Sequence, residues 1–352
     1  METNATVKKL YISEFTGTSG ICRYSSDFFD LIMKPRGFLF VSSSADIAEI
    51  LSGIDSDDII HLEIGLNRNR EIEILLVLIK RNHQHLSITL HDPPRLKYPY
   101  FQFNNRLLNN LSKIADLYFD NFGINKRLFG KLKKIYVLNH LSKKILETKF
   151  GLSNAIYIPH ILRQEEILTE AMVENNNFLF FGFLGRNKGI ERALALHREI
   201  MIKYPDSNFY IVGSTLSTKV QKYIDKLHRK YSRNVHFLGF VPSENLTEVF
   251  KLANYVFLPF QERKFINPTS GSLLTSLKYN KIVFSNSVNA ISEIIISGET
   301  GYFLPASLSE SAVFILEKMN EKNELVAVKQ NIARQLSLRF TKGAVNALFC
   351  EQ

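Results

Sequence analysis

The stretch "FGFLGRNKGIERAL", residues 181–194, decides the fold of the C-terminal half of the chain. An apolar run gives way to three closely spaced glycines, Gly182, Gly185 and Gly189, and an amphipathic helical pattern follows them. A strand that turns directly into a helix presents free backbone N–H groups at the positive end of the helix dipole, which favours an anion. Arg186 can bind phosphate oxygens in bidentate fashion, and Lys188 adds a point charge. The turn therefore predicts a diphosphate site.

The same turn does not match the common phosphate-loop motifs. It lacks the Gly-Lys-Ser/Thr ending of a Walker loop, and its glycines do not have the spacing of GxGxxG. A solvated basic loop between a strand and a helix therefore stays open as the alternative interpretation.

The bulk properties indicate a globular protein with anionic partners. The chain has 352 residues, which predicts two domains, and 45% of them are hydrophobic. The net charge of +10 favours nucleotides, nucleic acid or an acidic membrane surface. Two cysteines do not make a disulfide scaffold, and we see neither a signal peptide nor a membrane-spanning stretch. We expect a cytoplasmic location.

Short apolar runs alternate with segments of helical period along the whole chain. In the first half we predict strands at 8–15, 37–43, 58–65, 86–92, 133–139 and 154–159, with helices at 21–33 and 71–82. In the second half we predict strands at 178–185, 208–214, 234–241, 254–260 and 281–286, and helices at 189–203, 217–231, 243–252, 271–279 and 290–297. This alternation predicts an α/β protein with two Rossmann-like, doubly wound domains that face each other across a cleft.

A second polar corner lies in "NPTSGSLLTSLKY", residues 267–279. Ser270, Gly271 and Ser272 present backbone amides and hydroxyls where a helix is expected to begin, which suits an anion or a sugar. Simple N-capping by Ser270 is the alternative, and the two roles are compatible.

Several of these stretches resemble the donor-binding domain of GT-B glycosyltransferases, close to family 4, the glycosyl transferases group 1. The resemblance is carried by "FLGRNKGIERAL" (183–194), "VHFLGFVPSENLTEVFKLANYVFLPF" (235–260) and "NKIVFSNSVNAISEIIISGETGYFLP" (280–305). In the first half "TSGICRYSSDFFDLI" (18–32), "TLHDPP" (89–94) and "YIPHI" (157–161) are similar to family motifs, and "LRFTKGAVNALF" (338–349) resembles the final helix.

The resemblance implies a domain organisation and a set of site residues. It implies an acceptor-binding domain at 1–165, a nucleotide-sugar donor-binding domain at 166–330, and a C-terminal helix, 331–352, that crosses back to the first domain. The catalytic residues that it implies are His91, Asp92, Arg186 and Lys188. The donor-binding residues that it implies are Gly20, Gly185, Arg186, Lys188, Ser214, Gly239, Phe240, Val241, Asn267, Ser270, Gly271, Ser272 and Thr275. Arg186 and Lys188 would neutralise the leaving diphosphate, so no metal and no other cofactor is expected.

The chain departs from the family pattern at one pair of positions. Family 4 proteins usually carry two glutamates separated by seven residues, where this chain has Asn267 and Thr275. The family implies a retaining reaction, in which the leaving phosphate can accept the proton of the acceptor. If the reaction inverts, a carboxylate of the first domain must serve as base, and Asp92 and Glu14 are the candidates.

The expected function is transfer of a sugar from a UDP- or GDP-sugar to a glycan or a lipid-linked oligosaccharide in bacterial surface polysaccharide biosynthesis. The segments 103–119 and 125–134 combine an apolar face with basic residues and could dock on an anionic membrane, at the cytoplasmic face of the inner membrane. No nucleic-acid-binding motif is present in the sequence, so we expect no nucleic-acid partner. A sugar-nucleotide epimerase of GT-B-like fold and a non-catalytic nucleotide-sugar-binding protein are the alternatives.

Overall fold

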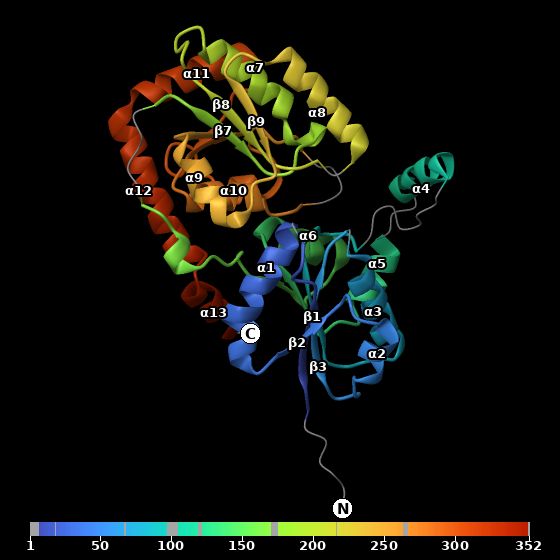
Figure 1. The fold of residues 1–352 in the computed structure, drawn as a ribbon. Coiled ribbons are helices and arrows are strands. Elements are labelled where there is room, and N and C mark those ends of the chain that lie inside the picture. The colour runs from blue at the N-terminus through green and yellow to red at the C-terminus, as the bar shows by residue number, and fades with distance from the viewer. Residues whose placement is uncertain are drawn as a thin grey trace, which may run out of the picture. The chain divides into compact units, whose positions relative to one another are not determined.

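The structure is a computed structural model that describes residues 7–17, 19–66, 68–96, 105–118, 122–169, 175–215, 217–262 and 267–350. The chain forms two compact units, each built around its own sheet (Figure 1). Unit 1 comprises Met1–Ile161, Lys264–Thr269 and Lys342–Gln352. Unit 2 comprises Leu162–Arg263 and Ser270–Thr341. A short piece of the second half of the sequence thus belongs to unit 1.

The sheet of unit 1 is parallel and has six strands in the order β2-β1-β3-β4-β5-β6. The strands are β1 (Lys9–Ser13), β2 (Leu39–Ser42), β3 (Ile59–Ile64), β4 (Leu86–Leu90), β5 (Lys134–Val137) and β6 (Ala155–Tyr157). The strands predicted in this half are confirmed. The chain proceeds from β1 to β2 and then reverses to β3, so the topological switch point, where ligands of such sheets bind, lies between β1 and β3.

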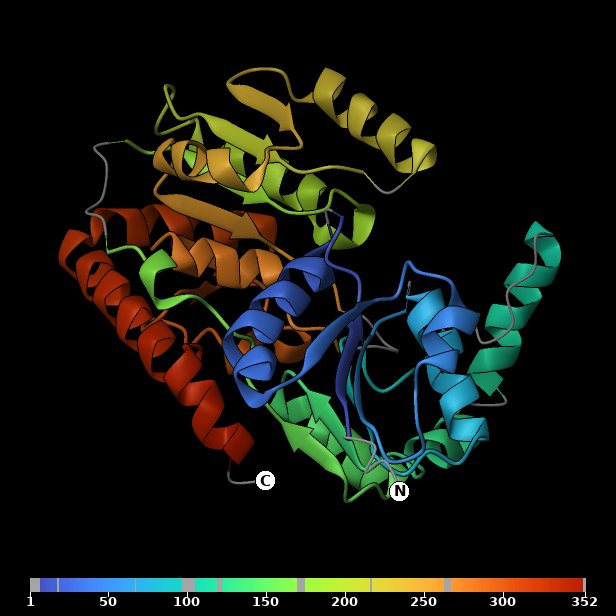
Figure 2. The same ribbon diagram turned by 60° about the horizontal axis from the view of Figure 1, so that its bottom comes forward.

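Helices cover both faces of this sheet because its strands are apolar on both sides. Tyr11 and Ile12 are adjacent in β1 and are both fully buried, but they belong to different core clusters. In Figure 2, α1 (blue) lies on one side of the sheet, and α2 and α3 (light blue to cyan) lie on the other. The α-helices of unit 1 are α1 (Gly20–Phe28), α2 (Ile47–Ser52), α3 (Asn69–Lys80), α4 (Arg106–Tyr118), α5 (Phe122–Phe129), α6 (His140–Phe150) and α13 (Lys342–Cys350). A π-helical turn, Phe29–Met33, and a 3-10 turn, Lys34–Arg36, extend α1.

The sheet of unit 2 is also parallel and six-stranded, in the order β12-β11-β10-β7-β8-β9. Its strands are β7 (Phe178–Phe181), β8 (Phe209–Val212), β9 (Val235–Gly239), β10 (Tyr255–Leu258), β11 (Ile282–Ser285) and β12 (Tyr302–Phe303). The strands predicted here are confirmed, and β12 is an addition. The chain starts at β7, winds outward to β9 and returns to β10, which places the switch point between β7 and β10.

The α-helices of unit 2 are α7 (Ile190–Ile200), α8 (Thr218–Lys230), α9 (Leu246–Lys251), α10 (Gly271–Lys278), α11 (Leu308–Asn320) and α12 (Lys322–Arg339). Its 3-10 turns are Gln164–Glu166, Arg186–Lys188, Ser243–Asn245 and Asn289–Glu293. The prediction of a helix at 290–297 is wrong in type, since only that last 3-10 turn forms there. The β-branched run Ile294–Ile296 disfavours an α-helix.

The C-terminal segment is not one helix. The helix α12 ends at Arg339, Phe340 leaves the helical conformation and is buried in the core of unit 2, and α13 begins at Lys342. The burial of Phe340 accounts for the break, because its side chain could not fill that core from a continuous exposed helix. The residues of α13 are part of unit 1.

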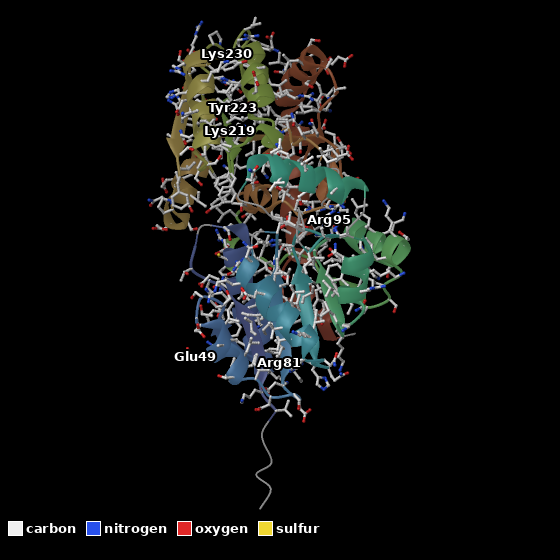
Figure 3. The ribbon with its side chains drawn as sticks, turned by 90° about the vertical axis from the view of Figure 1, so that its right-hand side faces the viewer. Glu49, Arg81, Arg95, Lys219, Tyr223 and Lys230 are labelled. Atoms are coloured by element: carbon white, nitrogen blue, oxygen red, sulfur yellow. The ribbon has the colours of Figure 1, made fainter. Side chains whose placement is uncertain are left out.

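A cluster of positively charged side chains lies on one face of α8. Ile224 and Leu227 of this helix are buried against the core, whereas its cationic side chains point outward (Figure 3). The exposed cations of the helix are Lys219, Lys222, Lys226, Arg229 and Lys230. Tyr223 donates a hydrogen bond to Glu191 of α7 (3.3 Å), which ties the two helices together. The helix is thus a surface element of ordinary amphipathic design.

Candidate functional site

The carboxyl edge of the unit 2 sheet is lined by backbone rather than by side chains. Gly182, Gly213 and Gly239 stand at the ends of the neighbouring strands β7, β8 and β9, with φ angles of 126°, 149° and 69°. A Cβ atom on Gly213 would lie 1.8 Å from the carbonyl oxygen of Gly182. The backbones therefore approach so closely that only glycine fits at Gly213. This edge therefore presents main-chain groups rather than side chains.

The amino end of α10 meets this edge at β7. A Cβ atom on Gly182 would lie 2.9 Å from Oγ of Ser272. Ser270 caps the helix, since its Oγ accepts a hydrogen bond from the backbone N–H of Leu273 (3.2 Å), so the capping interpretation is confirmed. No atom lies within 4 Å of a Cβ placed on Gly271. The Ser-Gly-Ser corner is thus placed beside the glycine-lined strand ends.

The "GRNKG" turn lies at the switch point of the same sheet. Residues Arg186–Lys188 form a 3-10 turn, and Gly189, with φ of 74°, begins α7 without a side-chain cap. The backbone N–H of Gln261, just after β10, donates to the carbonyl oxygen of Asn187 (3.1 Å). The first turn of α7 has no side-chain cap, and such a turn can bind an anion through its backbone N–H groups.

Lys188 is the positively charged side chain that the structure places at this turn. Its Nζ lies 4.5 Å from the ring centroid of Phe260, a cation–π contact that fixes the side chain near the end of β10. The side chain of Arg186 lies outside the part that the structure describes, so only its backbone position in the 3-10 turn is known.

The remaining residues expected to bind the donor are spread along the same edge. The backbone N–H of Leu184 donates a hydrogen bond to the carbonyl oxygen of Ser214 (2.9 Å). This bond keeps Gly185, the next residue, close to Ser214. Phe240 follows β9 with 54% of its surface exposed, whereas Val241 packs against the core. Thr275 is half-buried, one turn after Ser272 in α10. Most of the predicted donor residues thus converge on one edge of one sheet.

Asn267 and Gly20 do not lie on this edge, because both belong to unit 1. Its backbone N–H donates to the carbonyl oxygen of Pro93 (2.7 Å), and its own carbonyl oxygen accepts from Asn139 Nδ2 (2.9 Å). Thr269 Oγ1 donates to the carbonyl oxygen of Leu138 (3.1 Å). The chain therefore anchors residues 267–269 at the carboxyl ends of β4 and β5, a placement that sequence reasoning missed.

His91 lies close to this anchored segment, directly after β4. Its backbone N–H donates to Ile64 (2.8 Å), and its Nε2 lies 2.7 Å from Oε2 of Glu63. The Glu63 side chain is fully buried and also accepts a hydrogen bond from the hydroxyl of Tyr11 (2.7 Å). Burial alone would raise the pKa of Glu63, but the hydrogen bonds from His61 and His91 outweigh it and lower the pKa to about 2. Sequence reasoning missed Glu63 altogether.

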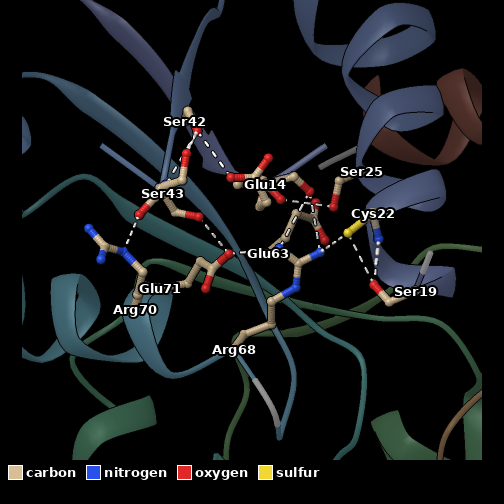
Figure 4. Close-up of polar contacts among 12 residues, drawn as sticks. Glu14, Ser19, Cys22, Ser25, Ser42, Ser43, Glu63, Arg68, Arg70 and Glu71 are labelled. Carbon is tan, nitrogen blue, oxygen red and sulfur yellow. Dashed lines mark hydrogen bonds and ion pairs between the residues drawn. The ribbon is translucent and has the colours of Figure 1, made fainter. Parts of the chain in front are cut away.

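A further polar network occupies the switch point of unit 1 (Figure 4). Arg68 binds the Glu71 carboxylate (2.8 Å), the carbonyl oxygen of Glu14 and the Cys22 sulfur (3.3 Å). Burial tends to raise the pKa of Glu14, yet hydrogen bonds from Thr16 and from nearby serines lower it to about 2. A carboxylate of such low basicity is a poor general base.

Asp92 and Gly20, the other two site residues expected in unit 1, follow the strands β4 and β1. Asp92 is half-buried, and its Oδ2 accepts a hydrogen bond from the backbone N–H of Leu66 (3.1 Å). Gly20 begins α1 directly after the cap residue Ser19, and no atom lies within 4 Å of a Cβ placed on it. The loop before α1 therefore leaves open space beside Gly20.

Membrane-spanning helices and metal clusters are both absent from the described ranges. In that part of the chain, no helix has both the length and the apolar character needed to cross a bilayer. Within the same ranges, no group of three or more His, Cys, Asp or Glu residues is placed to hold a metal ion.

Comparison with protein families shows which family the second half of the chain matches. Residues 166–335 match the family model described as Glycosyl transferases group 1. This segment is a glycosyl transferases group 1 domain. The resemblance stated from the sequence is confirmed at the level of this group, and so is the predicted enzyme class, a glycosyltransferase.

Solved structures show that the GT-B fold extends over the whole chain. HepE of Anabaena, solved in complex with UDP, is 14% identical with a TM-score of 0.71, covering 98% of this chain and 99% of that one. Sucrose-phosphate synthase of Thermosynechococcus elongatus is 13% identical with a TM-score of 0.74, covering 98% of each chain. A glycosyltransferase of Rickettsia africae is 11% identical with a TM-score of 0.67, covering 99% of this chain and 98% of that one. The search of curated proteins finds no match. The two Rossmann-like domains predicted from the sequence are confirmed, with the group 1 domain forming most of unit 2.

Proposed function

We propose that this glycosyltransferase transfers a sugar from a UDP-sugar to a glycan or a lipid-linked oligosaccharide in the assembly of a bacterial surface polysaccharide. The observation that carries the proposal is the glycine-lined carboxyl edge of unit 2, at which the amino ends of two helices and Lys188 meet. The HepE structures in complex with UDP and with UDP-glucose support a uracil nucleotide as the first donor to test, with GDP-sugars second.

The diphosphate of the donor would lie across the ends of β7 and β10. In this proposal the main-chain N–H groups of the uncapped first turn of α7 and the hydroxyl of Ser272 would bind the diphosphate. Lys188, with Arg186, would neutralise the charge that develops on the leaving diphosphate as the glycosidic bond breaks. Each charged hydrogen bond contributes about 1.5–3 kcal/mol, so a few of them suffice for micromolar affinity. In this proposal the cationic side chains make a divalent ion unnecessary.

The nucleobase would stack beside β9. Phe240 offers a half-exposed aromatic side chain next to the glycine at the end of that strand. Stacking of a base on an aromatic ring is worth about 1–3 kcal/mol and tolerates any base. Contacts from Gly239 and Val241 through main-chain groups would then select among bases.

We propose that the reaction retains the configuration of the donor sugar. Asn267 and Thr275 cannot act as a base or carry a negative charge, and the low pKa of Glu14 makes that carboxylate a weak base as well. A leaving phosphate that accepts the proton of the acceptor hydroxyl requires no protein carboxylate. If the reaction inverts, Asp92 is the remaining candidate base among those that the sequence suggested.

The part of the protein that binds the acceptor would contact an anionic membrane through α4 and α5. Leu107, Leu108, Leu111 and Ile114 of α4 recur at helical spacing, and each is at least 46% exposed. Lys126 and Arg127 in the last turn of α5 are exposed. An apolar helical face together with cations is the pattern of helices that lie in the interface of acidic bilayers, and the net charge of +10 has the matching sign. A lipid-linked acceptor would be reached at such a surface, on its cytoplasmic side.

A panel of sugar nucleotides tests the donor. In a thermal-shift assay, a UDP-sugar at 100 times its dissociation constant should stabilise the protein by about 2.7 kcal/mol. ADP-sugars serve as the control, and the absence of any shift with UDP- and GDP-sugars would refute the donor class. With the best donor, product formation is measured with and without an acceptor. Free sugar and nucleoside diphosphate released in equal amounts without acceptor would instead indicate the epimerase.

A non-catalytic nucleotide-sugar binder is the second candidate. The observation in its favour is the pair Asn267 and Thr275 at the positions where family 4 glutamates are usual. It predicts a thermal shift with the donor but no turnover with any acceptor, and transfer of sugar to a single acceptor would exclude it.

A further inference from the structure

We propose that Glu63 is a positioning residue that fixes the tautomer of His91 and so presents the lone pair of His91 Nδ1 to a sugar hydroxyl. This inference rests on the proposed function, because it assumes that a sugar hydroxyl reaches the end of β4. It assigns a role to a buried carboxylate near the carboxyl end of β3, where a charged group would otherwise be costly.

The first step of the argument concerns the charge of Glu63. Its side chain has no exposed surface, and its pKa is lowered to about 2, so the carboxylate is ionised over the whole physiological pH range. An ionised carboxylate can only accept hydrogen bonds. Since Nε2 of His91 lies 2.7 Å from Oε2, this ring nitrogen must carry the proton and donate it. A neutral His91 then has its lone pair on Nδ1.

The second step concerns the orientation of the carboxylate. Its other oxygen, Oε1, accepts the hydroxyl of Tyr11 at 2.7 Å and faces Nε2 of His61 at 3.3 Å. The His61 ring is itself held between Ser87 Oγ (2.9 Å) and Thr89 Oγ1 (3.0 Å). It also stacks on the Tyr11 ring, with centroids 5.5 Å apart. Because Oε1 is held by two partners, Oε2 stays directed at His91.

The third step concerns the other groups around His91. The edge of the ring packs against Tyr24 of α1, with centroids 4.9 Å apart and planes at 81°. His160 packs on Tyr24 in turn (4.7 Å), and burial is the main cause that lowers the pKa of His160 to about 3. His160 is therefore uncharged near neutral pH and does not compete for the Glu63 carboxylate. Among the residues that the structure describes, none makes a hydrogen bond to Nδ1 of His91.

An acceptor nitrogen at this place has a chemical use. The hydroxyls of a sugar are donors as well as acceptors, so a fixed lone pair orients a hydroxyl, whereas the opposite tautomer would repel its proton. The backbone of Asn267, two residues from Thr269 in the anchored segment, is held at the same strand ends. Glu63 acts through His91 and does not touch the sugar.

Nitrogen NMR of the wild-type protein with ring-labelled histidine tests the inference directly. We expect the His91 signal, recognised as the one lost in His91→Gln, to show a protonated Nε2 and an unprotonated Nδ1. In Glu63→Gln the amide oxygen should keep the two partners on the Oε1 side, so its NH2 group faces His91 and moves the ring proton to Nδ1. Glu73→Gln on the exposed face of α3 is the matched control and should change nothing. A proton on Nδ1 of wild-type His91, or an unchanged tautomer in Glu63→Gln, would overturn the inference.

Kinetics separate a positioning role from a structural one. Glu63→Gln should lower kcat/KM for sugar transfer by about 10²-fold, the usual size of a lost acid–base or orienting contact. The affinity for UDP should stay unchanged, since UDP lacks the transferable sugar whose hydroxyl would meet His91. Equal kcat/KM in Glu63→Gln and wild type would overturn the inference. Absence of transfer by the wild type with every donor would refute the proposed function and leave the NMR result to stand by itself.

Discussion

The carbonyl oxygen of Pro259 lies 1.9 Å from the position that a Cβ atom on Gly189 would occupy. Pro259 directly follows β10, and Gly189 begins α7 with a φ angle of 74°, in the left-handed region. The two residues therefore join the amino end of α7 to the end of β10 by backbone contact alone. This contact sets the position of the turn that carries Arg186 and Lys188.

Gly189→Ala should destabilise unit 2. The added methyl group collides with backbone rather than with a movable side chain, and the left-handed φ adds strain of about 1–3 kcal/mol. We expect the free energy of unfolding in urea to fall by at least that amount. Gly271→Ala, where a Cβ meets open space, is the control and should change it by less than about 1 kcal/mol. Equal stability of the two variants would contradict the close approach.

The double variant Arg186→Ala/Lys188→Ala should lose donor affinity. Two charged contacts to a diphosphate are worth about 1.5–3 kcal/mol each, so the Kd for the UDP-sugar should rise at least 100-fold in calorimetry. Lys203→Ala is the control for Lys188, because Lys203 also lies over an aromatic ring, that of Tyr204, at 5.6 Å. An unchanged Kd in the double variant would eliminate the proposed donor site.

Leu107→Ser/Leu111→Ser should weaken binding to anionic vesicles. Both side chains are more than half exposed on α4, and burial of a leucine in the bilayer interface is worth about 1.5–3 kcal/mol. We expect at least tenfold weaker co-sedimentation with phosphatidylglycerol vesicles. Val326→Ser/Leu338→Ser removes exposed apolar residues from α12 and should not affect binding. Equal losses in both variants would argue against a specific role of α4.

The stability of the protein should fall in mild acid because of His197. Its side chain is fully buried next to Phe209, and burial is the main cause that lowers its pKa to about 4. The folded pKa lies below the unfolded value of 6.5, so the unfolded state binds more protons, and stability is lost as the pH falls from about 6.5 to about 4. The loss is on the order of 3 kcal/mol.

His197→Gln should flatten the stability profile in that pH window. Glutamine can still donate to Ser207, which His197 Nε2 contacts at 3.2 Å, but it does not titrate. Urea unfolding between pH 7 and pH 4 provides the measurement. His228→Gln, at an exposed position of α8, should keep the wild-type slope. If the slope of His197→Gln equals that of the wild type, another group causes the acid loss.

The strands and the edge of unit 2 could be predicted from the sequence because their signals are local. The run 178–185 is apolar up to Gly182, and a glycine between an apolar run and a helical pattern is typical of a strand-to-helix turn. The predicted strands are longer than the observed ones, since the apolar residues after Phe181 and Leu258 continue into the loops. Apolar content does not reveal where hydrogen bonding between strands stops.

Glu63 and the anchored segment 267–269 could not be predicted, because their partners are distant in sequence. In "DIIHLEIG" the alternation of His61 and Glu63 with apolar residues is typical of a strand with one solvated face. The structure covers that face with α1, so the polar pair is buried and needs partners from β1 and β4. Likewise, nothing near Asn267 in the sequence indicates the hydrogen bond to Pro93, which is 174 residues away (267 minus 93).

The anchoring of residues 267–269 also limits how the protein can be recombined. A chimera that exchanges 162–341 as one cassette would replace a loop whose hydrogen bonds to Pro93 and Asn139 belong to the recipient half. Functional hybrids with other proteins that carry a group 1 domain would have to take residues 267–269 from the same parent as β4 and β5. Residues 267–269 and the first half of unit 1 therefore have to be inherited together, although much of the sequence of unit 2 separates them.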